Sequence, residues 1–159
     1  MSKKIVFPLF VFCYVLDQAS KWAVVRWLEP DEFIEVIPGF FNIVRVGNTG
    51  AAFGTMSGSN TFFIFLTLAI LIVLGVMAWF GAFRTPLQAT SITLLAAGAC
   101  GNFTDRIVHG HVVDFLEFIL PLYGPWPAFN VADSCICIAA VLLIIGAFLK
   151  SEKTAAGGK

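Results

Sequence analysis

The chain has 159 residues, about the size of one domain. Hydrophobic residues make up 58% of it and charged residues 13%, and the mean hydropathy is +0.88, outside the range of soluble globular proteins. A soluble protein of this size cannot bury so much apolar surface, so the composition predicts an integral membrane protein. The formal net charge is zero, which gives no indication of a nucleic acid partner.

Four apolar segments indicate membrane-spanning helices. They cover about residues 5–28, 61–80, 86–104 and 131–149. Residues 61–80 are almost wholly apolar, and a helix of that length is about 30 Å long, the thickness of the hydrocarbon core of a bilayer. Asp17 and Lys21 interrupt the first segment, and Pro86 opens the third at a position that helices tolerate. The expected fold is one membrane domain, residues 1–159, built as a bundle of four transmembrane helices.

The first segment also has the pattern of a cleaved signal peptide, because Lys3 and Lys4 precede a run of apolar residues. Two features favour a retained helix instead. The apolar pattern resumes after Lys21 and continues to Leu28, and Asp17 and Lys21 stand four residues apart, on one helix face. We therefore expect this segment to remain as the first span.

The charges outside the spans predict an orientation. Four spans place both termini on one side, where six basic residues accompany a single acidic residue, Glu152. Lys and Arg are enriched in cytoplasmic segments of membrane proteins, so both termini are expected in the cytoplasm. The six basic residues are Lys3, Lys4, Arg84, Lys150, Lys153 and Lys159.

Two segments remain on the opposite side, at about residues 29–59 and 105–130. The first contains EFIEVIPGFFNIVRV and then GNTG, in which β-branched residues in imperfect alternation precede a turn signal. This pattern predicts short strands and a tight turn. The second, over residues 107–129, is rich in Pro, Gly and aromatic residues that suit the membrane–water interface.

The four cysteines, Cys13, Cys100, Cys135 and Cys137, all lie inside apolar runs. Cys135 and Cys137 are two residues apart and point to different faces of a helix, which disfavours a shared metal or a disulfide. We expect them to pack as small hydrophobic residues.

Ionisable residues inside apolar segments cost about 2.5–3.5 kcal/mol each at the centre of a spanning helix, so they mark candidate sites. Asp17 and Lys21, in DQASK, can pair across one helical turn. Their role is either a structural ion pair that fixes the first helix or a part of a site. A paired carboxylate is held ionised, which disfavours a direct catalytic role.

A second cluster, in GNFTDR, ends the third span. Asn102, Asp105 and Arg106 are spaced i, i+3 and i+4 and share a helix face. The helix macrodipole disfavours Asp105 at this end and favours Arg106. The cluster serves either to cap and anchor the helix or to orient other groups.

Asp114, in GHVVDF, and Asp133, at the head of the fourth span, form the third candidate. If their carboxyls meet, one must stay protonated, because like charges at short range cannot both ionise in a low dielectric. One carboxyl then acts as a base on water and the other as an acid, as in aspartic proteases. The spacing alone leaves two alternatives open: Asp133 as a helix N-cap, and Asp114 paired with Arg106.

His109 and His111, in HGH, raise the possibility of a metal enzyme. Two histidines around a glycine, with no nearby cysteine or Glu-x-x-His motif, are weak evidence for zinc. We expect no metal and no other cofactor.

Five motifs occur in order: LDQASK, NTGAAFG, GNFTDR, HVVDF and FNVADS. On a four-span chain of this length, the set closely resembles lipoprotein signal peptidase, the type II signal peptidase family of bacteria. The resemblance implies an intramembrane aspartic endopeptidase without a metal. Its substrate would be a diacylglyceryl-modified prolipoprotein, cleaved immediately before the lipidated lipobox cysteine. It also implies a four-helix bundle with a small extracytoplasmic β-cradle, supplied mostly by residues 29–59. A short interfacial loop or helix, from residues 107–129, would cover the site.

The resemblance implies Asp114 and Asp133 as the catalytic pair. It marks nine further residues as binding the substrate or shaping and stabilising the site: Asp17, Lys21, Asn48, Gly50, Asn102, Asp105, Arg106, Asn130 and Ala132. Gly47 departs from the expected pattern, because a larger residue is expected before the motif asparagine, and it would loosen the local strand.

The resemblance extends to partners and location. It implies contact with membrane lipid, inhibition by globomycin-like cyclic peptides, and a monomer in the bacterial cytoplasmic (inner) membrane with its active site near the extracytoplasmic face. The competing reading is a small transporter or lipid-binding protein, in which the buried charges form an ion path. Transporters place polar residues near the midplane on broken helices, whereas here the polar clusters gather at the external helix ends.

Overall fold

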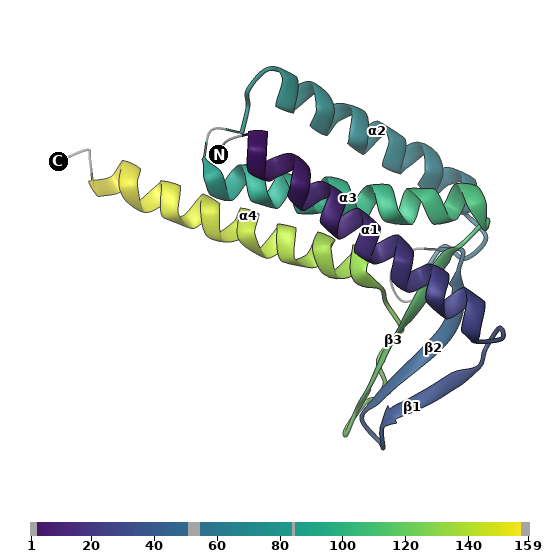
Figure 1. Cartoon of the computed structure of the whole chain (residues 1–159). Helices are drawn as coiled ribbons and strands as arrows, with labels where there is room; N and C mark the ends of the chain where they lie inside the picture. The colour runs from purple at the N-terminus through teal and green to yellow at the C-terminus, as the bar shows by residue number, and fades with distance from the viewer. Residues whose placement is uncertain (1–2, 51–54, 84, 157–159) are drawn as a thin grey trace.

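The computed structural model describes residues 3–50, 55–83 and 85–156. Four long helices lie beside one another, and a small antiparallel sheet projects from one end of them (Figure 1). The helices are α1 (Lys3–Trp27), α2 (Asn60–Trp79), α3 (Pro86–Val108) and α4 (Val131–Ala156). The end of α1, the start of α2, the end of α3 and the start of α4 all face the sheet, and both chain ends lie at the opposite end.

Two helices within the described residues are long and apolar enough to cross a membrane, over Asn60–Trp79 and Val131–Leu149. None of the residues of α2 is buried, and large side chains such as Phe65, Ile72 and Val76 are exposed along it. A continuous exposed apolar helix of this kind marks a lipid-facing surface. The sequence predicts four spans, and these two helices correspond to the second and the fourth of them. The helices of the first and third predicted spans, over their described residues, do not meet the same criterion.

Helices α1 and α3 carry the polar interior of the molecule. The buried positions of α1 and its exit are Cys13, Asp17, Lys21, Val24 and Leu28, a stripe with a spacing of three or four residues on one face. α3 begins at a capping box in which Thr85 and Gln88 exchange hydrogen bonds. The polar residues of α1 are therefore turned toward the other helices rather than toward lipid.

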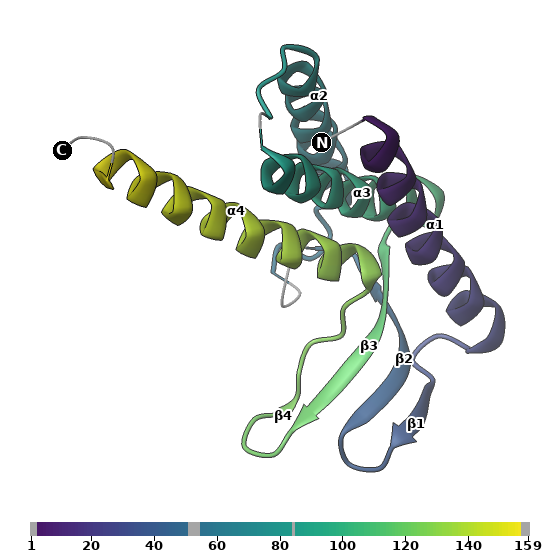
Figure 2. The same cartoon turned by 60° about the vertical axis from the view of Figure 1, so that its left-hand side comes forward.

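The sheet has the strand order β1-β2-β3-β4, with β1 (Phe33–Ile37), β2 (Phe41–Asn48), β3 (Val112–Leu120) and β4 (Gly124–Pro125). The β1–β2 turn passes through Gly39 at φ +66°, a conformation that glycine adopts without strain. This hairpin confirms the predicted short strands, but its tight turn lies at Gly39 and not at GNTG, whose Gly47 and Asn48 belong to β2. Turned by 60°, the sheet still projects past the helix ends (Figure 2).

The segment 107–129 differs from the loop that the sequence suggests. Its residues Val112–Leu120 form β3, which pairs with β2 on one side and with β4 on the other. Phe129 then returns to bridge Leu116, so the chain enters α4 directly beside β3. This return places residue 114 next to residue 133.

The cysteines of the described residues are free. Cys13 and Cys135 are buried and pack with Ala97 in one apolar cluster, which confirms their prediction as small hydrophobic residues. Cys137 is exposed on α4. Residues 51–54 of the NTGAAFG motif, and Arg84 and Lys159 of the orientation argument, lie outside the described residues.

Candidate active site

A cleft of about 960 Å³ lies between the sheet and the first turns of α4. Asp114 and Asp133 both line it. Apolar side chains, among them Phe63, Phe129 and Ile136, form much of the remaining wall. The cleft therefore combines two carboxyl groups with a surface suited to an apolar ligand.

Asp114 reaches the cleft from β3 and is only 3% exposed. Its Oδ2 accepts a hydrogen bond from Asn48 Nδ2 at 3.0 Å, and its Oδ1 accepts one from Asn130 Nδ2 at 2.7 Å. Asn48 belongs to β2, where Val46 is the direct cross-strand partner of Asp114. The β2–β3 pairing thus fixes one side of the carboxyl group.

Asp133 reaches the cleft from the first turn of α4. Asn130 is the N-cap of this helix: its Oδ1 accepts from Asp133 N–H at 2.9 Å, while its own N–H donates to Asp133 Oδ2 at 3.2 Å. This reciprocal arrangement is a capping box with Asp133 at the third helical position. Asp133 is therefore not the N-cap itself, and its carboxyl accepts a second hydrogen bond, to Oδ1 from Asn102 Nδ2 at 2.8 Å.

Asn130 connects the two aspartates, since its amide donates to Asp114 and its carbonyl oxygen accepts from the backbone of Asp133. Burial, followed by the charge of Asp133, raises the pKa of Asp114 from 3.8 to about 7, against the hydrogen bonds from Asn48 and Asn130. A carboxyl group with that pKa is available as a proton donor near neutral pH. The pair therefore has the electrostatics of two carboxyls that share one proton.

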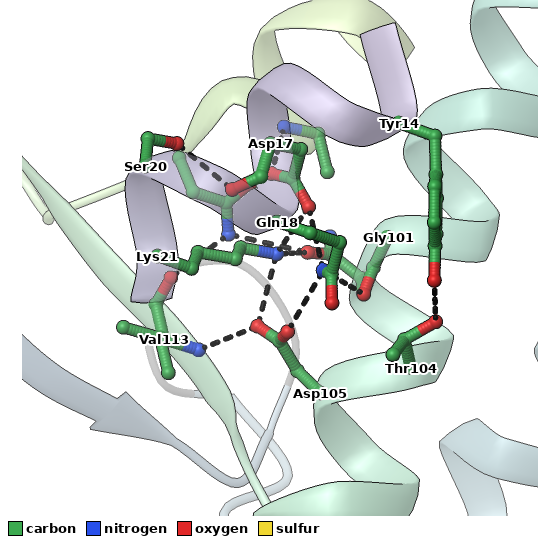
Figure 3. Close-up of polar contacts among 12 residues, drawn as sticks. Tyr14, Asp17, Gln18, Ser20, Lys21, Gly101, Thr104, Asp105 and Val113 are labelled. Atoms are coloured by element: carbon green, nitrogen blue, oxygen red, sulfur yellow. Dashed lines mark hydrogen bonds and ion pairs between the residues drawn. The ribbon is translucent and has the colours of Figure 1, made fainter. Parts of the chain in front are cut away.

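Behind the aspartates, Lys21 lies in a buried polar network that joins α1 to α3 (Figure 3). Its ammonium group is 3.0 Å from Asp17 Oδ2, which confirms the predicted pairing across one turn, and 2.9 Å from Asp105 Oδ2. Gln18 joins the same network through Nε2, which donates to Asp17, to Asp105 and to the carbonyl of Gly101. Sequence reasoning missed Gln18, although it lies within the LDQASK motif.

Arg106 is 8% exposed and turns toward the NTGAAFG motif, where its guanidinium donates to the carbonyl of Gly50 at 2.9 Å and stacks over Phe63. Gly50 N–H in turn donates to Asn48 Oδ1 at 2.9 Å. The ion pairs among the described residues are those of Lys21, so the alternative pairing of Asp114 with Arg106 does not form. Arg106 Nε is buried without a hydrogen-bond partner in this structure.

Small residues let α3, α4 and α1 approach closely. A Cβ at Gly98 would collide with the carbonyl oxygen of Ala132, and one at Gly101 would collide with the carboxylate of Asp17. Ala132 is completely buried, and its N–H donates to Asp17 Oδ1 at 2.8 Å. Sequence reasoning missed both glycines, which a helical spacing of three residues in GACG could have indicated.

Gly47 does not loosen its strand as the sequence suggested. It stays within β2, paired with Val113, and the imidazole of His111 occupies the space of its missing side chain. A Cβ built at Gly47 would lie 2.9 Å from His111 Cδ2. Over the described ranges, no group of three or more His, Cys, Asp or Glu side chains is arranged to hold a metal ion.

One continuous chain of hydrogen bonds and ion pairs connects all the residues singled out from the sequence. They are Asp17, Lys21, Asn48, Gly50, Asn102, Asp105, Arg106, Asp114, Asn130, Ala132 and Asp133. These residues come from α1, β2, α3, β3 and α4 and from the segments that follow β2 and precede α4. The fold thus brings together residues that are up to 115 positions apart in the sequence.

Comparison with known proteins agrees with this architecture. The family model described as signal peptidase (SPase) II matches residues 9–149. Lipoprotein signal peptidases of Staphylococcus aureus strains JH9 and Newman are each 42% identical over 135 residues, 85% of this chain and 82% of theirs.

Two solved structures are also similar. A bacterial membrane enzyme determined by the in meso method at 2.3 Å resolution has a TM-score of 0.87 and 36% identity, covering 99% of this chain and 93% of that one. A second, determined at 1.9 Å, has a TM-score of 0.81 and 38% identity, covering 92% and 94%.

The protein is therefore a membrane protease of the aspartic type. More particularly, the chain belongs to the signal peptidase II family.

Proposed function

We propose that this protein removes the signal peptide from diacylglyceryl-modified prolipoproteins, cutting immediately before the lipidated lipobox cysteine, with Asp114 and Asp133 as the catalytic pair. The observation that carries the proposal is the bridge made by Asn130. One side chain holds both carboxyl groups at the wall of an apolar cleft. Membership of the signal peptidase II family supplies the substrate class.

The proposed reaction is direct hydrolysis. The ionised aspartate accepts a proton from a water molecule as the water oxygen attacks the carbonyl carbon before the cysteine. The protonated aspartate donates to the carbonyl oxygen, and a proton then passes to the amine as the C–N bond breaks. One water is consumed, and the products are a signal peptide with a free carboxyl group and a mature chain with a free amine. The raised pKa of Asp114 makes it a suitable donor near pH 7.

Substrate recognition would use both the apolar and the polar side chains that line the cleft. The diacylglyceryl chains and the apolar signal helix suit the side formed by Phe63 and by α4 residues such as Ile136. Asn48 and Arg106 line the cleft, where an extended substrate backbone would meet hydrogen-bond partners, and the buried Nε of Arg106 is such a donor. Asn130 is completely buried and holds the two aspartates instead. Cyclic peptides of the globomycin type would compete for this same cleft.

The proposed setting is the bacterial cytoplasmic membrane, with four spans, both termini in the cytoplasm and a monomeric enzyme. The arrangement of the helices supports this, since the sheet lies at the end of the helices opposite to the start of α1 and the end of α4. The cleft is at the same end, because residues of β2 and β3 line it. We count α1 and α3 as spans despite their charges because Asp17, Lys21 and Asp105 are buried and Lys21 forms an ion pair with each of the two carboxylates. The cleft then opens near the extracytoplasmic face.

The test is cleavage of a purified diacylglyceryl-modified prolipoprotein by the parent and by Asp114→Asn and Asp133→Asn, with a chelator present. Asp31→Asn, on an exposed turn of the sheet region, is the matched control. We expect the parent and the control to cut before the lipidated cysteine and both dyad variants to be inactive while folded. Near-parental activity in either dyad variant would refute its catalytic role, and loss of activity with chelator would indicate a metal enzyme.

A further inference from the structure

The amino group of Lys21 is almost completely enclosed, since the residue is 2% exposed. Three acceptors surround it: Asp17 Oδ2 at 3.0 Å, Asp105 Oδ2 at 2.9 Å and Asn102 Oδ1 at 2.9 Å. An ammonium group has three N–H donors, so each has one acceptor and none is left over. Figure 3 shows this convergence on the lysine from α1 and α3.

Two of these acceptors continue to the backbone beside the aspartates of the cleft. Asp17 Oδ1 accepts from the N–H of Ala132 at 2.8 Å, and Ala132 immediately precedes Asp133. Asp105 Oδ2 accepts from the N–H of Val113 at 3.0 Å, and Val113 immediately precedes Asp114. Each carboxylate that pairs with Lys21 therefore holds the residue just before one member of the dyad.

The third acceptor leads to the dyad directly. Because Lys21 donates to Asn102 Oδ1, the amide of Asn102 is turned so that its Nδ2 faces Asp133 Oδ1, at 2.8 Å. Asn130 Nδ2 also donates to Asn102 Oδ1, at 3.2 Å. The orientation of this amide, and hence one hydrogen bond to Asp133, depends on the lysine.

A purely structural ion pair would not require this pattern. Buried charges are costly to desolvate, and replacing a buried ionic cluster with apolar residues of similar volume is often neutral or stabilising. Here the cluster contains one cation and two carboxylates, and each of the three acceptors around the cation also bonds to Asp133 or to the residue just before Asp114 or Asp133. The arrangement favours a role in the reaction over a role in holding α1 alone.

We propose that Lys21 is a positioning residue of the hydrolysis, which sets the separation of Asp114 and Asp133 through Asp17 and Asp105 and orients Asn102 toward Asp133. This inference rests on the proposed catalytic role of the two aspartates. Lys21 does not touch the substrate. Its effect is on kcat, because a displacement of about 1 Å in a catalytic group can cost on the order of 100-fold in rate.

Lys21 also acts on the charge of the dyad. Its positive charge lowers the pKa of Asp114, against the larger effects of burial and of Asp133. Lys21 contacts Asp17 of α1 and Asn102 and Asp105 of α3, and its charge also acts on Asp114 and Asp133. Its three partners bond in turn to Gln18 of α1, Val113 of β3, and Asn130 and Ala132 at the start of α4. Removing the cation alone raises the pKa of Asp114. Because Asp114 is the proposed proton donor, the alkaline limb of the pH–rate profile then moves to higher pH.

The experiment compares Lys21→Met with the uncharged triple variant Asp17→Asn/Lys21→Met/Asp105→Asn. Lys21→Met leaves two buried carboxylates without their cation and loses thermal stability. The triple variant has no charge in the cluster, and its amides still accept from Ala132 and Val113. Ser91→Ala, which removes a completely buried hydroxyl bonded to the carbonyl of Leu87, is the matched control. Thermal midpoint, kcat, KM and the pH–rate profile are measured on the purified proteins with the lipidated substrate.

We expect the triple variant to recover most of the parental thermal midpoint while kcat stays about 100-fold lower and KM changes little. Lys21→Met should move the alkaline limb to higher pH, and Lys21→Arg, which keeps the charge, should retain the parental alkaline limb. Recovery of parental kcat together with stability in the triple variant, or an unmoved alkaline limb in Lys21→Met, overturns the proposal while leaving the proposed function intact. A folded parent that does not cleave the substrate overturns both.

Discussion

Asn130 offers the sharpest test of how the site is built, because one side chain performs two separable tasks. Its Oδ1 caps α4 by accepting from Asp133 N–H, and its Nδ2 donates to Asp114. Serine is as good an N-cap as asparagine but is too short to replace the amide donor. Asn130→Ser therefore keeps the cap but removes the amide donor, with its bonds to Asp114, Asn102 and the carbonyl of Val113, whereas Asn130→Ala removes the cap as well.

The expected magnitudes follow from these two interactions. A hydrogen bond to a charged group contributes about 1.5–3 kcal/mol, and one pKa unit corresponds to about 1.4 kcal/mol. Loss of the Asn130 donor therefore raises the pKa of Asp114 above its value of about 7 by roughly one to two units. Loss of the cap costs about 1 kcal/mol of stability.

The assay is cleavage of the lipidated substrate from pH 5 to pH 9, with the thermal midpoint measured on the same samples. Both variants should shift the pH–rate profile to higher pH and lower kcat, and Asn130→Ala should lower the midpoint by more than Asn130→Ser, because it also loses the cap. A profile that is unmoved in Asn130→Ser would refute the assignment of the amide as a donor that tunes Asp114. Equal loss of stability in the two variants would refute the capping role.

Three further predictions concern stability. The pKa of Asp114 is raised from 3.8 to about 7 in the folded state, so the protonated carboxyl stabilises the fold fully below pH 3.8, and this stabilisation is lost as the pH rises through 7. Asp114→Asn should remove this pH dependence of the unfolding free energy, which is on the order of 4 kcal/mol, and raise the thermal midpoint at pH 8. Gly47→Ala should destabilise the protein by about 1 kcal/mol because of the contact with His111, and should be neutral or stabilising in a His111→Ala background; a double-mutant cycle without coupling would contradict that contact. Gly98→Leu should separate α3 from α4 at Ala132 and abolish both folding yield and activity, and normal expression with full activity would show that this close approach is unnecessary.

Helical spacing was enough to predict the local part of the site. Asp17 and Lys21 pair across one turn, as expected from their separation of four residues. Asn102, Asp105 and Arg106 were predicted to share a face, but their partners could not be predicted, since those lie on other elements. Asn102 meets Asp133 and Arg106 meets Gly50, across 31 and 56 residues of sequence. No local pattern encodes contacts of that length.

The strand β3 is the main element that the sequence did not reveal. VVDFLEFIL lacks a regular alternation of polar and apolar residues, and the Pro- and Gly-rich stretch that follows it favours a loop. Its strand conformation comes from tertiary pairing with β2 on one side and from the bridge to Phe129 on the other. Residues 112–115 are buried, which explains the apolar run around Asp114.

The bridge between Leu116 and Phe129 has a practical consequence for engineering. The bridge holds the two ends of the segment between Leu116 and Phe129 together, so the relative positions of Asp114 and Asp133 do not depend on the length of that segment. Leu122 and Tyr123, at the tip, are 91% and 83% exposed. Lengthening a closed surface loop adds little entropic cost, about 0.6 kcal/mol for each doubling. The tip at residues 121–124 is therefore the place to insert an epitope or a fluorophore while leaving the dyad in register.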